Sequence, residues 1–362
     1  MPETPPLLCA SGSPTVTGMP SADRSVKRRA LLDLLADRRA SSLLLTTMPA
    51  ISWYLSGSRV QINLAAGPIV ELLVTLDGDE VHLQSNEHDR MLAEELPDDV
   101  TVHVRHWHEP LALAADLVEA DVEQELRDLR RALTPSDLQR LRSLGTDAAS
   151  VLTDALYAAT PEMSEFELAS LVAADVVVRG ADPLVILAQG ASRSSIRHPL
   201  PTSAPLGRRA MLVVCARRHG LIANVTRWVR FGPATADEAD ADARILEVEA
   251  DIFATLAPGK TLAGVLSEIV GFYPAQGFAD DEWLQHHQGG AAGWDTRDPV
   301  ATPDATDRLV LDQAFAFNPT GPGCKVEDTV QLTALGIDVL TVDPRWPTTL
   351  VRGIRRPLVL ER

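Results

Sequence analysis

The order of helices and strands in the middle of the chain constrains its fold most strongly. Thr134 with Pro135 starts one long helix, and Ser164 with Glu167 forms a capping box that starts the next. Three strand-like runs follow, and then two more helices: 184–187, 210–216, 221–229, about 237–256 and about 262–273. Because the helices are grouped rather than alternating singly with strands, we predict an α+β domain with a mostly antiparallel sheet.

The N-terminal third predicts a separate, smaller α/β domain. Its periodicity indicates helices and strands in this order: helix 24–39, strand 43–47, a hairpin of 69–76 and 80–83, strand 100–104 and helix 111–126. Three more strands are expected in the C-terminal part: 309–317, 327–332 and 339–342. We therefore predict a small domain over 21–126 and a larger one over 127–362. Residues 1–20 are rich in Pro, Ser, Thr and Gly and are expected to be a disordered tail.

Composition excludes several classes of function. A formal net charge of −17 over 362 residues argues against a nucleic-acid partner. No apolar run reaches the roughly 18 residues that a membrane-spanning helix needs, so no membrane partner is expected. The three cysteines, Cys9, Cys215 and Cys324, are too few and too scattered for a disulfide framework, which favours a cytoplasmic location.

The segment His286-His287-Gln288-Gly289-Gly290 is the clearest candidate for chemistry. Two histidines followed by two glycines can hold an imidazole against a closely approaching backbone, as metal-dependent hydrolases often do. One further motif precedes this segment, at 213–227, and ends in Thr226-Arg227. Two others follow it, Asn318-Pro319 and Glu327-Asp328-Thr329. Near the N-terminus, residues 51–57 read Ile-Ser-Trp-Tyr-Leu-Ser-Gly.

In this motif order the chain resembles the creatinase / aminopeptidase P / prolidase superfamily over about 20–345. The resemblance implies a C-terminal domain with the pita-bread fold and its curved, mostly antiparallel sheet. It also implies five metal-ligand positions, which here fall on Val213, Asn224, His287, Asn318 and Glu327. Only two of these five offer an imidazole or a carboxylate, so we predict no family-type dinuclear metal centre and no cofactor. A single weak metal on His287, Glu327 and a second histidine stays open.

A third histidine completes the predicted catalytic set. Residues 189–199 resemble the family segment that ends in a substrate-facing histidine, which here is His198. Creatinase is the family precedent for catalysis without metal, and a histidine in this segment shuttles the proton there. We predict His198, His287 and Glu327 as catalytic residues, because an imidazole titrates near neutrality. Glu327 is expected to raise the pKa of the imidazoles. His286 is expected to be structural or to support its neighbour.

Six further residues are predicted to contact substrate: Asn224, Asn318, Arg217, Arg227, His219 and Trp294. The two amides would bind polar groups where the metals of relatives lie, and the arginines would bind a carboxylate. Alternatives remain for the arginines. Arg227 could instead pair with Glu327 or Asp328, and only one of Arg217 and Arg218 can face the site, since they are neighbours on a strand.

These residues favour a metal-independent hydrolase that cleaves a C–N bond in a small polar amide, amidine or amino-acid derivative, compatible with secondary metabolism. Elimination, decarboxylation and cyclisation need the same proton transfers and stay open. Two alternatives differ in kind. One is a non-catalytic binding module, as in histone-chaperone domains of this fold, and the other is a metallo-aminopeptidase or prolidase with replaced ligands. By analogy with the family, we also expect a homodimer.

Overall fold

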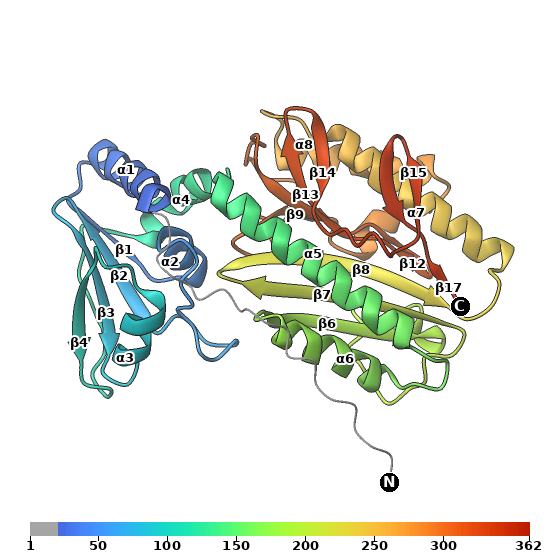
Figure 1. Ribbon diagram of the computed structural model, residues 1–362. Coiled ribbons are helices and arrows are strands. Elements are labelled where there is room, and N and C mark those ends of the chain that lie inside the picture. Colours follow the sequence, from blue (N-terminus) through green and yellow to red (C-terminus); the bar gives the residue numbers. More distant parts are fainter. Residues whose placement is uncertain (1–20) are drawn as a thin grey trace, which may run out of the picture.

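The computed structural model describes residues 21–362, which form two parts that lie side by side (Figure 1). The predicted tail at 1–20, with Cys9, lies outside the described residues. None of the helices within 21–362 combines the length and the apolar character needed to cross a membrane. Helices and strands are both present throughout, so the α+β prediction is confirmed.

The N-terminal part is built on a five-stranded sheet in the order β4-β3-β2-β1-β5. Its elements are α1 (Ser21–Arg38), β1 (Ser42–Leu45), α2 (Met48–Tyr54), β2 (Val70–Thr75), β3 (Asp79–Gln84), α3 (His88–Arg90), a π-helical turn (Met91–Glu95), β4 (Thr101–Arg105) and β5 (Leu117–Val118). The predicted hairpin at 77–79 is confirmed as the β2–β3 connection. Along β2 every second residue is buried, because one face of the sheet packs on the core and the other does not.

The predicted helix at 111–126 is wrong. The segment contains β5, a 3₁₀ turn (Glu119–Val122) and only the start of α4 (Glu123–Arg130). Long-range contacts decide this conformation. Strand β5 pairs in parallel with β1, and the Glu119 carboxylate accepts hydrogen bonds from the backbone N–H groups of Thr46 and Thr47 at 2.8 and 2.9 Å. Local periodicity carries no information about such distant partners.

The C-terminal part begins with the two predicted helices, α5 (Pro135–Ala158) and α6 (Glu165–Val178). Both predicted caps are confirmed, since Thr134 and Ser164 accept hydrogen bonds from the third residue of their helices at 3.2 Å. A four-stranded sheet follows in the order β17-β8-β7-β6, made of β6 (Asp182–Gly190), β7 (Arg209–Arg218), β8 (Leu221–Arg230) and β17 (Leu360–Glu361). Strands β6, β7 and β8 are antiparallel, and α5 and α6 lie along this sheet (Figure 1).

A second four-stranded sheet, in the order β14-β13-β10-β9, lies beyond the first. Its strands and flanking elements are α7 (Ala236–Thr255), α8 (Leu262–Ala275), β9 (Gly289–Ala292), β10 (Ala314–Phe317), β11 (Thr320–Gly321), β12 (Cys324–Lys325), β13 (Asp328–Thr333), β14 (Gly336–Val339), β15 (Thr348–Val351) and β16 (Ile354–Pro357). Helices α7 and α8 share a hydrophobic core with this sheet. The strand predicted at 309–317 is shorter, because β10 begins only at Ala314, and the strand predicted at 339–342 is shifted towards the N-terminus, because β14 ends at Val339.

The two sheets meet where β8 passes the start of β13. The backbone N–H of Thr226 donates to the carbonyl oxygen of Glu327 at 3.0 Å, and the N–H of Asn224 donates to Thr329 Oγ1 at 2.7 Å. The strand register puts Cys215 opposite Asn224 and Val213 opposite Thr226, so all four side chains lie on one face of the β6–β8 sheet. This junction positions the polar residues described next.

Candidate active site

Three histidines form the centre of the candidate site. His198 comes from the loop after β6, and His286 and His287 immediately precede β9. The Nε2 atoms of His198 and His286 lie 2.9 Å apart, and the rings of His286 and His287 stack with centroids 4.4 Å apart. The structure thus brings together His198 and His287, as the sequence predicted. It adds His286, which we expected to be structural or supporting.

The hydrogen bonds of His286 fix the direction of its protons. A backbone carbonyl oxygen can only accept, so His286 Nδ1 donates to the carbonyl oxygen of His287, 2.5 Å away. In a neutral ring this leaves the lone pair on Nε2 of His286, which therefore accepts from Nε2–H of His198. The remaining lone pair of a neutral His198 is then on Nδ1. Because the proton of the buried His286 is held by a backbone carbonyl oxygen, His286 orients His198 and leaves Nδ1 of His198 as the atom that can accept a proton.

The pKa values of all three histidines are lowered, which contradicts the expectation that Glu327 would raise them. Burial and then the charge of Lys325 lower the pKa of His286 to about 2. Desolvation, then Arg297 and Lys325, lower the pKa of His287 to about 4, and desolvation followed by Lys325 lowers the pKa of His198. The charge of Glu327 does act upward on His198 and His287, but it is outweighed. At neutral pH the imidazoles are therefore uncharged and can accept a proton.

Glu327 is paired with a cation that belongs to the chain itself. One carboxylate oxygen accepts from Arg297 Nη2 at 2.6 Å, and the other accepts from Thr226 Oγ1 at 3.0 Å. Lys325 is buried nearby, where desolvation lowers its pKa although Glu327 acts to raise it. Neither cation was predicted from the sequence. Lys325 could have been found, because residues two apart in extended backbone share a face; Arg297 follows β9 in a loop and carries no such signal.

Two buried amides carry polar atoms without partners. Asn224 is fully buried, and neither its Oδ1 nor its Nδ2 has a hydrogen-bond partner among the described residues. Asn318 is buried too, and its Oδ1 is likewise unpartnered. Leaving a buried polar group unpaired costs about 1–3 kcal/mol, so a polar ligand at these atoms would regain that energy. Both residues fit the substrate-binding role that the sequence predicts for them.

The residues present do not fit a dinuclear metal centre of the kind that the resemblance implies. Of the five positions, Val213 has no donor atom, Asn224 and Asn318 are neutral, and the single carboxylate is already paired with Arg297. The three histidines are a different donor set. One ring nitrogen of each lies within 4.8 Å of the other two, so the group could hold one transition-metal ion.

The two predicted arginines are held in ion pairs. Arg227 Nη2 donates to Asp328 at 2.8 Å and to the carbonyl oxygen of Thr341 at 2.9 Å, the structural pairing that the sequence left open. It lies on the face of β8 opposite to Asn224. Arg217 donates to Asp182 at 2.8 Å and to Gln61 at 2.6 Å. Neither arginine has a contact with the histidines, so a substrate-binding role for them stays a prediction that these pairings disfavour.

His219 and Trp294 lie where the N-terminal part packs on the second. His219 occupies the turn between β7 and β8 with φ of 51°, next to Gly57 of the N-terminal part. Burial, then the charge of Arg140, lower its pKa. Trp294 is buried in the larger hydrophobic core, with Lys27 Nζ 5.1 Å from its ring centroid. Both contacts favour a packing role, and substrate binding by these two residues stays a prediction.

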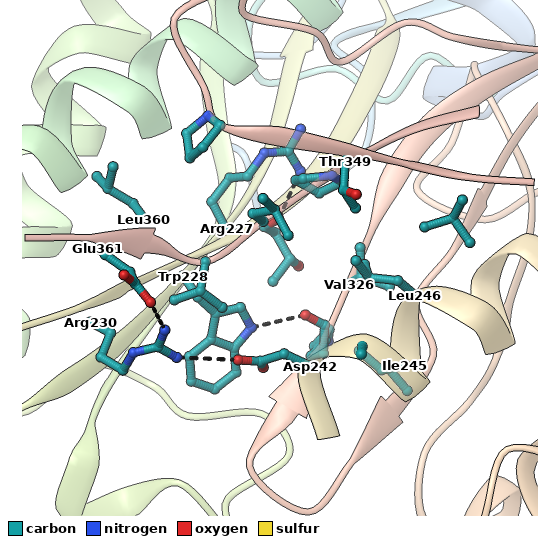
Figure 2. Close-up of a pocket in the computed structure, with 18 of the residues that line it drawn as sticks. Arg227, Trp228, Arg230, Asp242, Ile245, Leu246, Val326, Thr349, Leu360 and Glu361 are labelled. Atoms are coloured by element: carbon teal, nitrogen blue, oxygen red, sulfur yellow. Dashed lines mark hydrogen bonds and ion pairs between the residues drawn. The ribbon is translucent and has the colours of Figure 1, made fainter. Parts of the chain in front are cut away.

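A cavity of about 830 Å³ lies beside the site rather than at the histidines. Residues of β8, α7 and the C-terminal strands line it, among them Trp228, Arg230 and Asp242 (Figure 2). Arg230 pairs with Asp242 and Glu361, and Trp228 Nε1 donates to the backbone oxygen of Lys325 at 2.9 Å. None of the three histidines lines this cavity, although Lys325 and Thr226 do.

The grouped helices, the antiparallel β6–β8 sheet and the polar junction with β13 define a protein of the pita-bread class, the creatinase / aminopeptidase P / prolidase superfamily. The family model described as "Metallopeptidase family M24" matches residues 139–334. The chain therefore belongs to metallopeptidase family M24. The search of curated proteins found no match.

Solved structures of the same fold cover nearly the whole chain. A prolidase from Pyrococcus horikoshii is 17% identical, with a TM-score of 0.72, and the match covers 88% of this chain and 99% of that one. An Xaa-Pro dipeptidase from Bacillus anthracis is 14% identical, with a TM-score of 0.73 and coverage of 94% and 100%. The N-terminal domain of a FACT complex subunit from chickpea, Cicer arietinum, is 11% identical, with a TM-score of 0.68 and coverage of 89% and 96%. At these identities the likeness concerns the fold alone.

Proposed function

We propose that this protein is a metal-independent hydrolase that cleaves a C–N bond in a small polar amide, amidine or amino-acid derivative. One observation carries the proposal. Neutral, hydrogen-bonded imidazoles lie beside two cations of the chain, Lys325 and Arg297, at a site where the family motif would place metal ligands. Imidazoles supply a proton acceptor, and fixed cations supply positive charge for a developing oxyanion.

The hydrolytic step that we propose needs only water and groups of the chain. A neutral imidazole, His198 or His287, takes a proton from water while the oxygen attacks the carbonyl or amidine carbon. With an amide, negative charge develops on the carbonyl oxygen, and Lys325 or Arg297 stabilises it; with an amidinium, the attack instead neutralises the positive charge of the substrate. The imidazolium then returns the proton to the leaving nitrogen, the C–N bond breaks, and an acid or amide and an amine leave. The unpartnered atoms of Asn224 and Asn318 hold the polar substrate.

The test is turnover after exhaustive chelation. A panel of small amides, amidines and Xaa-Pro dipeptides is assayed with the wild type and with the His198→Ala and His287→Ala variants. His88→Ala is the matched control, because His88 is a half-exposed histidine of the N-terminal part. We expect chelated wild type and His88→Ala to keep full activity, and each site variant to lose at least about 100-fold in kcat. Activity that disappears with the chelator would refute metal independence.

The proximity of the three histidines supports a second candidate, a hydrolase with one transition-metal ion on this trio. Under this reading, Xaa-Pro dipeptides are the first substrates to test, because the prolidase and Xaa-Pro dipeptidase above share the fold. Elemental analysis of the purified protein separates the candidates. One equivalent of zinc, manganese or cobalt that is lost in His286→Ala would favour the second.

Location and assembly follow from the same resemblance and remain proposals. A cytoplasmic location agrees with Cys215 and Cys324, which are both free thiols in the structure. A homodimer is expected from the family. Sedimentation of the purified chain at micromolar concentration would test it, and a mass near 39.1 kDa would indicate a monomer instead.

A further inference from the structure

A second cluster of metal-binding residue types lies on the N-terminal sheet. Along β3, Val81 and Leu83 turn into the core, so Glu80 and His82 belong to the opposite face. His82 is in register with Glu71 of β2 on one side and with His103 of β4 on the other. Three neighbouring strands therefore present two imidazoles and two carboxylates on one face of the sheet.

The side chains converge at short distances. One oxygen of Glu80 lies 3.1 Å from Nε2 of His82 and 3.2 Å from Nε2 of His103. The two imidazole rings stack with centroids 4.5 Å apart and planes 17° apart. One ligand atom from each of Glu80, His82 and His103 lies within 4.8 Å of the other two. Small shifts of the side chains would bring all three to the roughly 2.0–2.2 Å that a zinc ion requires.

Unsatisfied atoms at the same place point to a missing partner. Glu71 Oε2 is buried and accepts no hydrogen bond from the described residues, and buried Nδ1 of His82 has no partner either. A metal bond at Nε2 of His82 would place the ring proton on Nδ1, and Glu71, which is in register with His82 on β2, is the neighbouring carboxylate that could accept it.

We propose that Glu80, His82 and His103 bind one divalent transition-metal ion of the zinc class, with Glu71 as the adjacent carboxylate. Two nitrogens and one or two oxygens match the ligand preference and the four-coordinate geometry of Zn²⁺. The ion would join β2, β3 and β4. Strand β4 stands at the edge of the sheet and is mostly exposed, so the ion would hold the edge strand in place. The site is separate from the histidines near β9 and does not depend on the proposed function.

The experiment is a titration of the full chain with Zn²⁺, read by hydrogen exchange. We expect about one equivalent to slow exchange in peptides covering 79–84 and 101–105. The variants His103→Ala and Glu80→Gln should lose this protection and bind that equivalent at least about tenfold more weakly. His103 is half-exposed, so its removal leaves the fold intact. His88→Ala, a half-exposed histidine without a place in the cluster, should behave as wild type.

Peptide resolution separates this site from the other histidine cluster. Protection confined to residues around 286–287, or equal protection of 101–105 in wild type and His103→Ala, would overturn the proposal. Protection of 101–105 that vanishes in both variants and survives in His286→Ala would establish it.

Discussion

Replacing Arg356 is expected to destabilise the protein more than any comparable arginine change on the same hairpin. Arg356 lies on β16 and is completely buried. Its Nε donates to Glu249 of α7 at 2.7 Å, and its Nη2 donates to Asp328 of β13 at 2.6 Å. Asp328 also accepts from Arg227, so it keeps one cation when Arg356 is removed. Glu249 would be left as a buried, unpaired carboxylate.

The magnitude follows from this burial. Breaking a buried ion pair by removing one partner costs about 3–5 kcal/mol, so we expect that loss for Arg356→Met. Arg352→Met is the matched control. Arg352 ties the same hairpin to the same helix through Glu247 and Asp251, but its side chain is 45% exposed. An exposed pair contributes about 0–1 kcal/mol, so the two variants should differ by several kcal/mol.

The assay is urea unfolding followed by circular dichroism, with the slope of the unfolding free energy against urea unchanged between variants. A double variant, Arg356→Met with Glu249→Met, should recover most of the loss, because the unpaired carboxylate is gone. Burial already raises the pKa of Glu249 above 4.5, and removal of Arg356 raises it further. A carboxyl group whose pKa is raised in the folded protein is buried in its neutral form at low pH and as an anion at high pH. The loss of unfolding free energy in Arg356→Met should therefore grow as the pH rises. Equal losses for Arg352→Met and Arg356→Met would refute this reasoning.

Three further predictions concern the site. The pKa of His286 is lowered from 6.5 in the unfolded chain to about 2 in the folded protein. Below about pH 6.5 the unfolded chain therefore binds a proton at this residue that the folded protein does not, and the free energy of unfolding decreases as the pH is lowered. Urea unfolding should show about 2 kcal/mol lost at this group between about pH 6.5 and 5, and His286→Asn should remove that slope. Gly289 has φ of 102°, and a Cβ there would lie 2.2 Å from a backbone oxygen of β10, so Gly289→Ala should cost at least about 1–3 kcal/mol in thermal unfolding. Arg297→Met frees the Glu327 carboxylate and should raise Mn²⁺ affinity at least about tenfold in calorimetry, whereas unchanged affinity would show that Arg297 does not exclude a cation.

The helices that the sequence predicted well are those with local signals at their ends. Thr134 and Ser164 each accept a hydrogen bond from within the first turn, so the information that starts α5 and α6 lies within four residues. The segment at 111–126 was wrong because Glu119 is held by backbone groups of Thr46 and Thr47, more than seventy residues away. No local pattern contains that contact.

The candidate site divides in the same way. Family motifs located His198 and His287, and the structure brings them together with His286. The motifs did not predict Lys325 and Arg297, because the family pattern places metal ions in this site and contains no position for a positively charged side chain. The expected rise of the histidine pKa was wrong because burial of the rings, followed by the charges of Arg297 and Lys325, outweighs the upward effect of Glu327 on the pKa of His287.

Glu327 and Asp328 explain why a match to family motifs says more about the fold than about the chemistry here. They are consecutive residues at the start of β13, so their side chains point to opposite sides. Glu327 faces Thr226 and Arg297 in the polar site, while Asp328 is held by Arg227 and Arg356. Asp328 and Arg227, two residues that match the family pattern, thus tie the sheets together. Such residues are required by the fold whether or not a metal binds. The side chains of Asn224 and Asn318 form no such ion pairs, and at these two positions the residue type differs from the metal ligands that the family pattern implies.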